Sequence, residues 1–108
     1  MPGFTLYDRG AIIEDRAKTA DPQNSYTARL LASGVQRTAK KFGEEAVEAV
    51  IAAVAEDKAA LTAETGDVLY HLLVMLRACD VRLDDVMAGL EKRTAESGIA
   101  EKAKRKPL

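Results

Sequence analysis

Four carboxylates stand in pairs at helical spacing, in two segments of this 108-residue chain. Glu45 and Glu48 lie in the run KKFGEEAVEAV, and Glu64 and Asp67 lie in ETGD. Residues three apart share one side of an α-helix, so each pair can present two carboxylates in the same direction. Carboxylate oxygens are the ligands that hard divalent cations prefer in proteins. The two segments therefore predict a cation site if the chain brings the pairs together.

The two segments belong to long helices that are expected to pack antiparallel. Helical periodicity runs from Val35 to about Ala55, and Asp57 can cap a second helix that runs to about Cys79. Since a helix rises about 1.5 Å per residue, all four carboxylates lie about 10 to 18 Å from the reversal near Asp57. They are therefore expected at one level of a helical hairpin.

Each long helix also carries an apolar stripe beside its carboxylates. Glu44 and Glu48 border the first stripe, and Glu64 lies at the margin of the second. We expect the stripes to face a low-dielectric core. Gly43 and Gly66 adjoin the acidic pairs, where they either allow close approach of a helix or a ligand, or are tolerated defects. The stripe residues are Val47, Val50, Ile51 and Val54, then Leu61, Val68, Leu72, Met75 and Leu76.

The crowding of the carboxylates itself indicates a bound cation. Carboxylates brought together beside a core repel one another and raise one another's pKa unless a cation neutralises them. A ligand set made only of oxygen selects a hard divalent ion, which predicts Mg²⁺, with Mn²⁺ as a substitute. The alternative is that these are solvated helix charges, with Lys40 and Lys41 pairing with Glu44 and Glu45 four residues on.

Two shorter helices are predicted before the hairpin. The first covers about residues 4–19 and is followed by a loop at 20–24. The second is capped by Ser25 or Thr27 and ends near Gly34.

A last helix is predicted over about residues 83–97, with Gly98 ending it. The predicted class is all-α: one domain over residues 1–98, built as a helical bundle around the antiparallel hairpin. Residues 99–108 are expected to form a charged, flexible C-terminal tail.

Composition excludes several classes of function. Acidic and basic residues nearly balance, at 17 and 16, so no general attraction to nucleic acid or to an anionic membrane is expected. Cys79 is the single cysteine, and the longest apolar run, VLYHLLVML, is far too short to span a membrane. We therefore expect a reducing, cytoplasmic location, with Cys79 in the core.

Basic side chains precede the first acidic pair, where they can meet a phosphorylated ligand. Arg37, Lys40 and Lys41 are the candidates, although an ordinary basic helix face would look the same.

Hydroxyl and imidazole groups supply further candidates. Ser25, Tyr26 and Thr27 can present hydroxyls and backbone N–H groups to a phosphate, or can serve only as a helix cap. His71 follows Asp67 by four residues, so it can orient Asp67, contact a nucleotide or simply form a local hydrogen bond in the core.

The runs KKFGEEAVEAVIAA, AETGDVLYHLLVML and SYTARLLASG together resemble the phosphoribosyl-ATP pyrophosphohydrolases of histidine biosynthesis. That family belongs to the all-α MazG-like nucleotide pyrophosphohydrolase superfamily, and the likeness covers about residues 4–97. The pattern E-E-x-x-E with E-x-x-D indicates the superfamily, while SYTARLL and GDVLYHLLV point to the histidine-pathway family.

The resemblance implies Mg²⁺-dependent hydrolysis of phosphoribosyl-ATP between its α and β phosphates, the second step of histidine biosynthesis. The products are phosphoribosyl-AMP and pyrophosphate. Glu45, Glu48, Glu64 and Asp67 match the superfamily's metal ligands, and Glu44 matches a leading glutamate that could orient a second ion or the attacking water. We therefore expect Glu44, Glu45 and Glu48 to be catalytic.

Assembly and competing functions stay open at this point. A small helical chain with a wide aliphatic face favours a homodimer with the site near its interface, as the resemblance also implies. A housecleaning pyrophosphohydrolase for free nucleoside triphosphates would share the carboxylates. A non-catalytic dimerisation module and a di-iron bundle are further alternatives, the latter disfavoured by the lack of E-x-x-H pairs.

Overall fold

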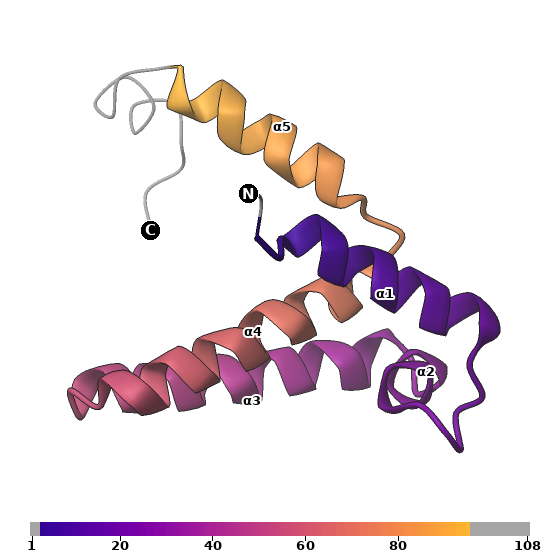
Figure 1. Ribbon diagram of the computed structural model, residues 1–108, viewed down its shortest axis with the longest axis horizontal. Helices are drawn as coiled ribbons and strands as arrows, with labels where there is room; N and C mark the ends of the chain where they lie inside the picture. Colours follow the sequence, from indigo (N-terminus) through magenta and orange to yellow (C-terminus); the bar gives the residue numbers. More distant parts are fainter. Residues whose placement is uncertain (1–2, 96–108) are drawn as a thin grey trace.

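The computed structural model describes residues 3–95 of the chain, which form five α-helices and no strand (Figure 1). The predicted all-α class is therefore confirmed. Gly98 and the tail at 99–108 lie outside the described residues. The helices are α1 (Leu6–Thr19), α2 (Tyr26–Ala32), α3 (Val35–Val54), α4 (Lys58–Ala78) and α5 (Leu83–Thr94).

Side-chain caps set the beginnings of three helices. Thr5 and Asp8 form a reciprocal capping box, so α1 begins at Leu6 and not at residue 4. Ser25, and not Thr27, caps α2. Asp57 caps α4 as predicted, because its carboxylate accepts a hydrogen bond from the backbone N–H three residues on, at 3.0 Å.

Both long helices end on a non-glycine residue in the left-handed conformation. Glu56 has a φ of 57°, and the backbone N–H groups of Glu56 and Asp57 donate to the carbonyls of Ala53 and Ala52, at 3.1 Å each. Asp80 has the same φ and the same pair of bonds at the end of α4. This Schellman geometry satisfies the last carbonyls of each helix. At Glu56 it also reverses the chain within three residues, so that α3 and α4 lie antiparallel, as Figure 1 shows.

The core lies where α1 and α2 pack against the C-terminal half of α4. Ile13, Leu30, Leu73 and Val74 form it, and Val74 is fully buried. The stripe predicted on α4 is only half-buried, because α1 and α2 contact the adjacent side of the helix. In Figure 1, α1 lies over this half of α4, while α5 projects away from the other helices.

The apolar stripe of α3 does not face the core, so that expectation is wrong. Val47, Val50, Ile51 and Val54 are between 56% and 79% exposed; we call them the valine face. The opposite side of α3 packs on α4 through small residues such as Ala52, which is 6% exposed. Apolar spacing identified a stripe correctly, but spacing alone does not say whether the stripe packs within the chain or outside it.

A Cβ built at Gly43 or Gly66 would meet nothing within 4 Å, so the structure does not support a close helix approach at either glycine; approach by a ligand is not tested, and tolerated defects agree with the open space. The expectation that Cys79 lies in the core is wrong. Cys79 is exposed, because it ends α4 at the Schellman turn and so lies outside the core. Among residues 3–95, no helix is long and apolar enough to cross a membrane.

Candidate active site

Three of the four predicted ligands meet between α3 and α4. Glu45 of α3 and Glu64 and Asp67 of α4 each offer a carboxylate oxygen, and these atoms lie within 4.8 Å of one another. Glu45 and Glu64 are half-buried and Asp67 is exposed. The antiparallel hairpin produces this meeting, because it places residues at equal distances from the reversal side by side.

Glu44 and Glu48 lie beside this cluster and are exposed. The Glu48 carboxylate is not one of the three that gather within 4.8 Å, although its charge reaches Glu64. Glu48 is therefore the one predicted ligand whose carboxylate lies outside the cluster.

Electrostatic strain is visible at Glu64. Its pKa is raised above the ordinary value, first by desolvation and then by the negative charges of Asp67, Glu45 and Glu48. Ionised carboxylates in this arrangement oppose one another, and a cation between them would remove that cost.

The donor set fits a hard divalent cation. It consists only of carboxylate oxygens, from two rigid helices, on the partly exposed side of the hairpin. Among the described residues it is the one group of three or more acidic, histidine or cysteine side chains close enough to share an ion.

One basic residue lies against the cluster. The ammonium of Lys41 is 3.4 Å from the Glu45 carboxylate, one turn away on α3. The pKa of Lys41 is raised by its hydrogen bond to Glu45 and further by nearby Tyr26 and Glu44. Arg37 and Lys40 are exposed on the same helix. The predicted pairing of Lys41 with Glu45 is therefore observed, and it leaves the two α4 carboxylates to other partners.

His71 is buried behind the carboxylates, at 6% exposure. Its Nδ1 lies 2.8 Å from the backbone carbonyl of Asp67, and its Nε2 lies 3.3 Å from the hydroxyl of Tyr26. The histidine thus connects the turn of α4 that carries Asp67 with the start of α2.

The hydroxyls of Ser25 and Thr27 are used within the fold. Ser25 caps α2, whereas Thr27 is buried and hydrogen-bonded to the hydroxyl of Tyr70. The guanidinium of Arg9 lies over the ring of Tyr70, 4.7 Å from its centre. The sequence did not indicate this contact between Arg9 and Tyr70, because no local spacing connects α1 with α4.

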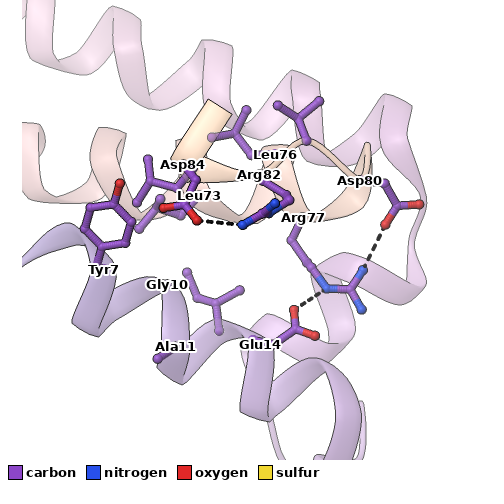
Figure 2. Close-up of a pocket in the computed structure, with 13 residues that line it drawn as sticks. Tyr7, Gly10, Ala11, Glu14, Leu73, Leu76, Arg77, Asp80, Arg82 and Asp84 are labelled. Carbon is purple, nitrogen blue, oxygen red and sulfur yellow. Dashed lines mark hydrogen bonds and ion pairs between the residues drawn. The ribbon is translucent and has the colours of Figure 1, made fainter. Parts of the chain in front are cut away.

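A cavity of about 630 Å³ lies elsewhere, between α1, the end of α4 and the start of α5. Figure 2 shows its charged lining residues in pairs: Arg77 contacts both Glu14 and Asp80, and Arg82 contacts Asp84. None of the clustered carboxylates lines it, so this cavity and the carboxylate cluster are two separate features of the described structure.

Comparison with known proteins identifies the family. Residues 7–94 match the family described as phosphoribosyl-ATP pyrophosphohydrolase. A phosphoribosyl-ATP pyrophosphatase of Methylobacterium radiotolerans is 60% identical over 99% of each chain. One from Roseobacter denitrificans is 64% identical over 92% of this chain and 93% of its own, and one from Rhizobium johnstonii is 54% identical over 97% of each. This chain belongs to the phosphoribosyl-ATP pyrophosphohydrolase family.

Proposed function

We propose that this protein hydrolyses phosphoribosyl-ATP between its α and β phosphates, releasing phosphoribosyl-AMP and pyrophosphate in the second step of histidine biosynthesis. The observation that carries the proposal is the meeting of Glu45, Glu64 and Asp67 within 4.8 Å, in a chain of a pyrophosphohydrolase family. Phosphoanhydride hydrolysis needs negative charge neutralised beside a well-placed water, and a carboxylate-held cation serves that purpose.

The proposed cofactor is Mg²⁺, with Mn²⁺ able to replace it. Glu45, Glu64 and Asp67 would hold the ion, and Glu48 would complete the set from the exposed side of α3. When bound, the ion would neutralise charge on the phosphoryl oxygens. The raised pKa of Glu64 supports this assignment, since the cluster is electrostatically incomplete by itself.

The chain's own residues would position the reactants. Lys41 already contacts Glu45 and can turn its ammonium to a phosphate at the edge of the cluster, with Lys40 and Arg37 further along α3 for the outer phosphates. Glu44 and Glu48 are exposed beside the cluster, where either carboxylate oxygen can hold a water and accept its proton as it attacks phosphorus. Ser25 and Thr27 would act indirectly by fixing α2.

The proposed assembly is a homodimer formed through the valine face. Val54 is 79% exposed there and Val50 is 60% exposed. An apolar stripe of this kind on a protein surface marks an interaction site, and a second copy would cover it symmetrically. Because the valine face and Glu45 belong to the same helix, α3, dimerisation would place both carboxylate clusters near the interface. The proposed location of the enzyme is the cytoplasm. Replacing Val50 by glutamate should halve the mass measured by sedimentation equilibrium, whereas an unchanged mass would place the interface elsewhere.

The function is tested by pyrophosphate release from phosphoribosyl-ATP with and without Mg²⁺. We expect turnover only with the metal, and we expect ordinary nucleoside triphosphates to be poor substrates. Glu48→Gln should abolish turnover while circular dichroism stays helical. Equal activity on free nucleoside triphosphates would favour the housecleaning function, and absence of both activities and of Mg²⁺ binding would favour a dimerisation module.

A further inference from the structure

Arg9 of α1 carries a positive charge that the described part of the chain does not pair. Arginine stays protonated in proteins. Within residues 3–95, its side chain forms no ion pair and no hydrogen bond, unlike those of Arg77 and Arg82. Arg9 is also half-buried, so water replaces a partner only in part. A half-buried guanidinium whose N–H donors have no acceptor is suited to bind an anion.

Tyr70 holds Arg9 beside the carboxylate cluster. The guanidinium carbon lies 4.7 Å from the centre of the Tyr70 ring, in a cation–π contact. Tyr70 follows Asp67 by three residues on α4, so the two side chains leave the helix on one side, about 4.5 Å apart along its axis. The hydroxyl contact with Thr27 fixes the Tyr70 ring from α2. Arg9 therefore lies over the helical turn that follows Asp67.

A contiguous group of three aromatic rings connects Arg9 with the carboxylates. The ring of Tyr70 meets that of His71 at 4.9 Å and stacks on that of Tyr26, with centres 6.3 Å apart and planes at 24°. His71 in turn contacts the backbone carbonyl of Asp67. Tyr26 is 48% exposed, so part of its ring surface is open to a ligand. Carboxylates, aromatic rings and an unpaired cation thus follow one another from the hairpin to α1.

We propose that Arg9 binds the phosphate of the phosphoribosyl group, and so gives the enzyme its specificity for phosphoribosyl-ATP over ordinary nucleoside triphosphates. This inference rests on the proposed function. Phosphoribosyl-ATP carries phosphate at both of its ends, because the base stands between the ribose of the triphosphate and the additional ribose phosphate. We call the additional group the far phosphate. A nucleoside triphosphate lacks it.

The order of groups in the substrate matches the order of groups in the protein. With the triphosphate at the carboxylate cluster, the base lies toward the aromatic rings, where Tyr26 offers exposed ring surface. The far phosphate then reaches Arg9, whose planar guanidinium can bind a phosphate through parallel N–H bonds. Lys41 stays with the triphosphate, because its ammonium contacts Glu45 in the cluster.

Binding of two nucleotides tests the role of Arg9. Phosphoribosyl-AMP carries the far phosphate, whereas AMP lacks the whole phosphoribosyl group. In isothermal titration calorimetry with Mg²⁺, Arg9→Met should weaken phosphoribosyl-AMP about tenfold, the value of a hydrogen bond between charged groups, and should leave AMP within about twofold. Methionine keeps an apolar chain over Tyr70 but has no charge. KM for phosphoribosyl-ATP should rise by a similar factor with a smaller change in kcat, since the far phosphate is remote from the reacting bond.

Two control variants separate phosphate binding from support of Tyr70. Arg9→Lys keeps a positive charge, so it should weaken phosphoribosyl-AMP clearly less than Arg9→Met does. Arg16→Gln removes a charge about two turns along α1, where Arg16 is exposed, and should leave both affinities unchanged. Circular dichroism should show the helical content of the unmodified protein in all three variants.

The outcomes separate failure of this role from failure of the proposed function. Equal losses for AMP and phosphoribosyl-AMP in Arg9→Met would mean that Arg9 only supports the aromatic rings, and would overturn the inference. Equal losses in Arg9→Lys and Arg9→Met, no loss in either, or an equal loss in Arg16→Gln would overturn it as well. If the unmodified protein does not cleave phosphoribosyl-ATP, the proposed function fails and the role of Arg9 fails with it. If it cleaves the substrate while Arg9→Met keeps its affinity for phosphoribosyl-AMP, only the role of Arg9 fails.

Discussion

Carboxylates near the two ends of α4 differ in whether a basic side chain pairs with them. Around the cavity at its C-terminal end they are paired: Arg77 Nε lies 2.6 Å from Glu14, and Arg82 Nη2 lies 2.6 Å from Asp84. In the N-terminal half, Glu64 and Asp67 lie together with Glu45, and within residues 3–95 the ion pair at this cluster is that of Lys41 with Glu45.

The pKa values carry the same contrast. The pKa of Glu14 is lowered, first by the hydrogen bond from Arg77, whereas the pKa of Glu64 is raised, first by desolvation and then by neighbouring carboxylates. The first arrangement favours the folded chain, and the second opposes it until a cation binds. Acidic groups that the fold leaves uncompensated are the better guide to function.

The largest effect is expected from neutralising the uncompensated cluster. Glu64→Gln should reduce Mg²⁺-dependent turnover by about 100-fold or more, because a metal ligand is lost. In metal-free buffer the same variant should unfold at a higher temperature than the unmodified protein, because repulsion is relieved. Glu14→Gln is the matched control and should keep its turnover within about twofold. Full activity in Glu64→Gln would remove this residue from the site.

Mg²⁺ binding should raise the free energy of unfolding through the carboxylate cluster and not through the paired carboxylates at the other end of α4. At a Mg²⁺ concentration about 100 times the dissociation constant, the free energy of unfolding should rise by about 2.7 kcal/mol, because only the folded chain assembles the site. Differential scanning calorimetry with added Mg²⁺ or with a chelator measures this rise. Glu14→Gln should show the same rise and Asp67→Asn little of it; equal rises in both variants would mean that the ion binds elsewhere.

A smaller effect is expected at the paired end of α4. Glu14→Gln should lower the free energy of unfolding at pH 7 by about 0.5 kcal/mol, a modest value because the Glu14 side chain is 41% exposed. Since folding lowers the pKa of Glu14 below its ordinary 4.5, its contribution is present above that pH and is lost as pH falls through the folded value. Urea unfolding at pH 7 and at pH 3 should therefore show the difference vanishing in acid. Asp80→Asn is the control, since the Asp80 side chain is 92% exposed.

The smallest effect is expected where the long helices end. Glycine tolerates the left-handed conformation, so Asp80→Gly and Glu56→Gly should each raise the free energy of unfolding by a few tenths of a kcal/mol, about 0.5 at most. Both variants should keep their activity, and their unfolding midpoints in urea measure the gain. A loss at Asp80 alone would show that its contact with Arg77 contributes more than its exposure indicates.

The helices and the acidic cluster could be predicted from sequence because both depend on local rules. Capping by Asp57 and helical periodicity fix α3 and α4, and a fixed rise per residue then fixes which carboxylates stand level. Counting residues away from the reversal placed all four carboxylates level, but it did not show that Glu48 would lie outside the group formed by Glu45, Glu64 and Asp67.

The remaining features depend on contacts that local rules do not contain. The hydroxyl contact between Thr27 and Tyr70 joins residues 43 apart, and the position of Arg9 over Tyr70 depends on how α1 lies on α4. The valine face has the strongest apolar pattern of α3, yet the side that packs on α4 contains Glu45 and small residues such as Ala52. The sequence also did not indicate that Glu56 adopts the left-handed conformation, because glycine is the usual residue just after the end of a helix.

Helix α3 carries Glu45 on the side that packs on α4 and the valine face on the other side, and this limits how the chain can change in evolution. Each residue turns a helix by about 100°, so inserting or deleting one residue in the middle of α3 would rotate one half against the other. Glu45 would then lose its place opposite Glu64, or Val50 and Val54 would turn toward α4. Substitutions along this helix can be absorbed singly, but its length between Thr38 and Ala52 is expected to be constant among active relatives.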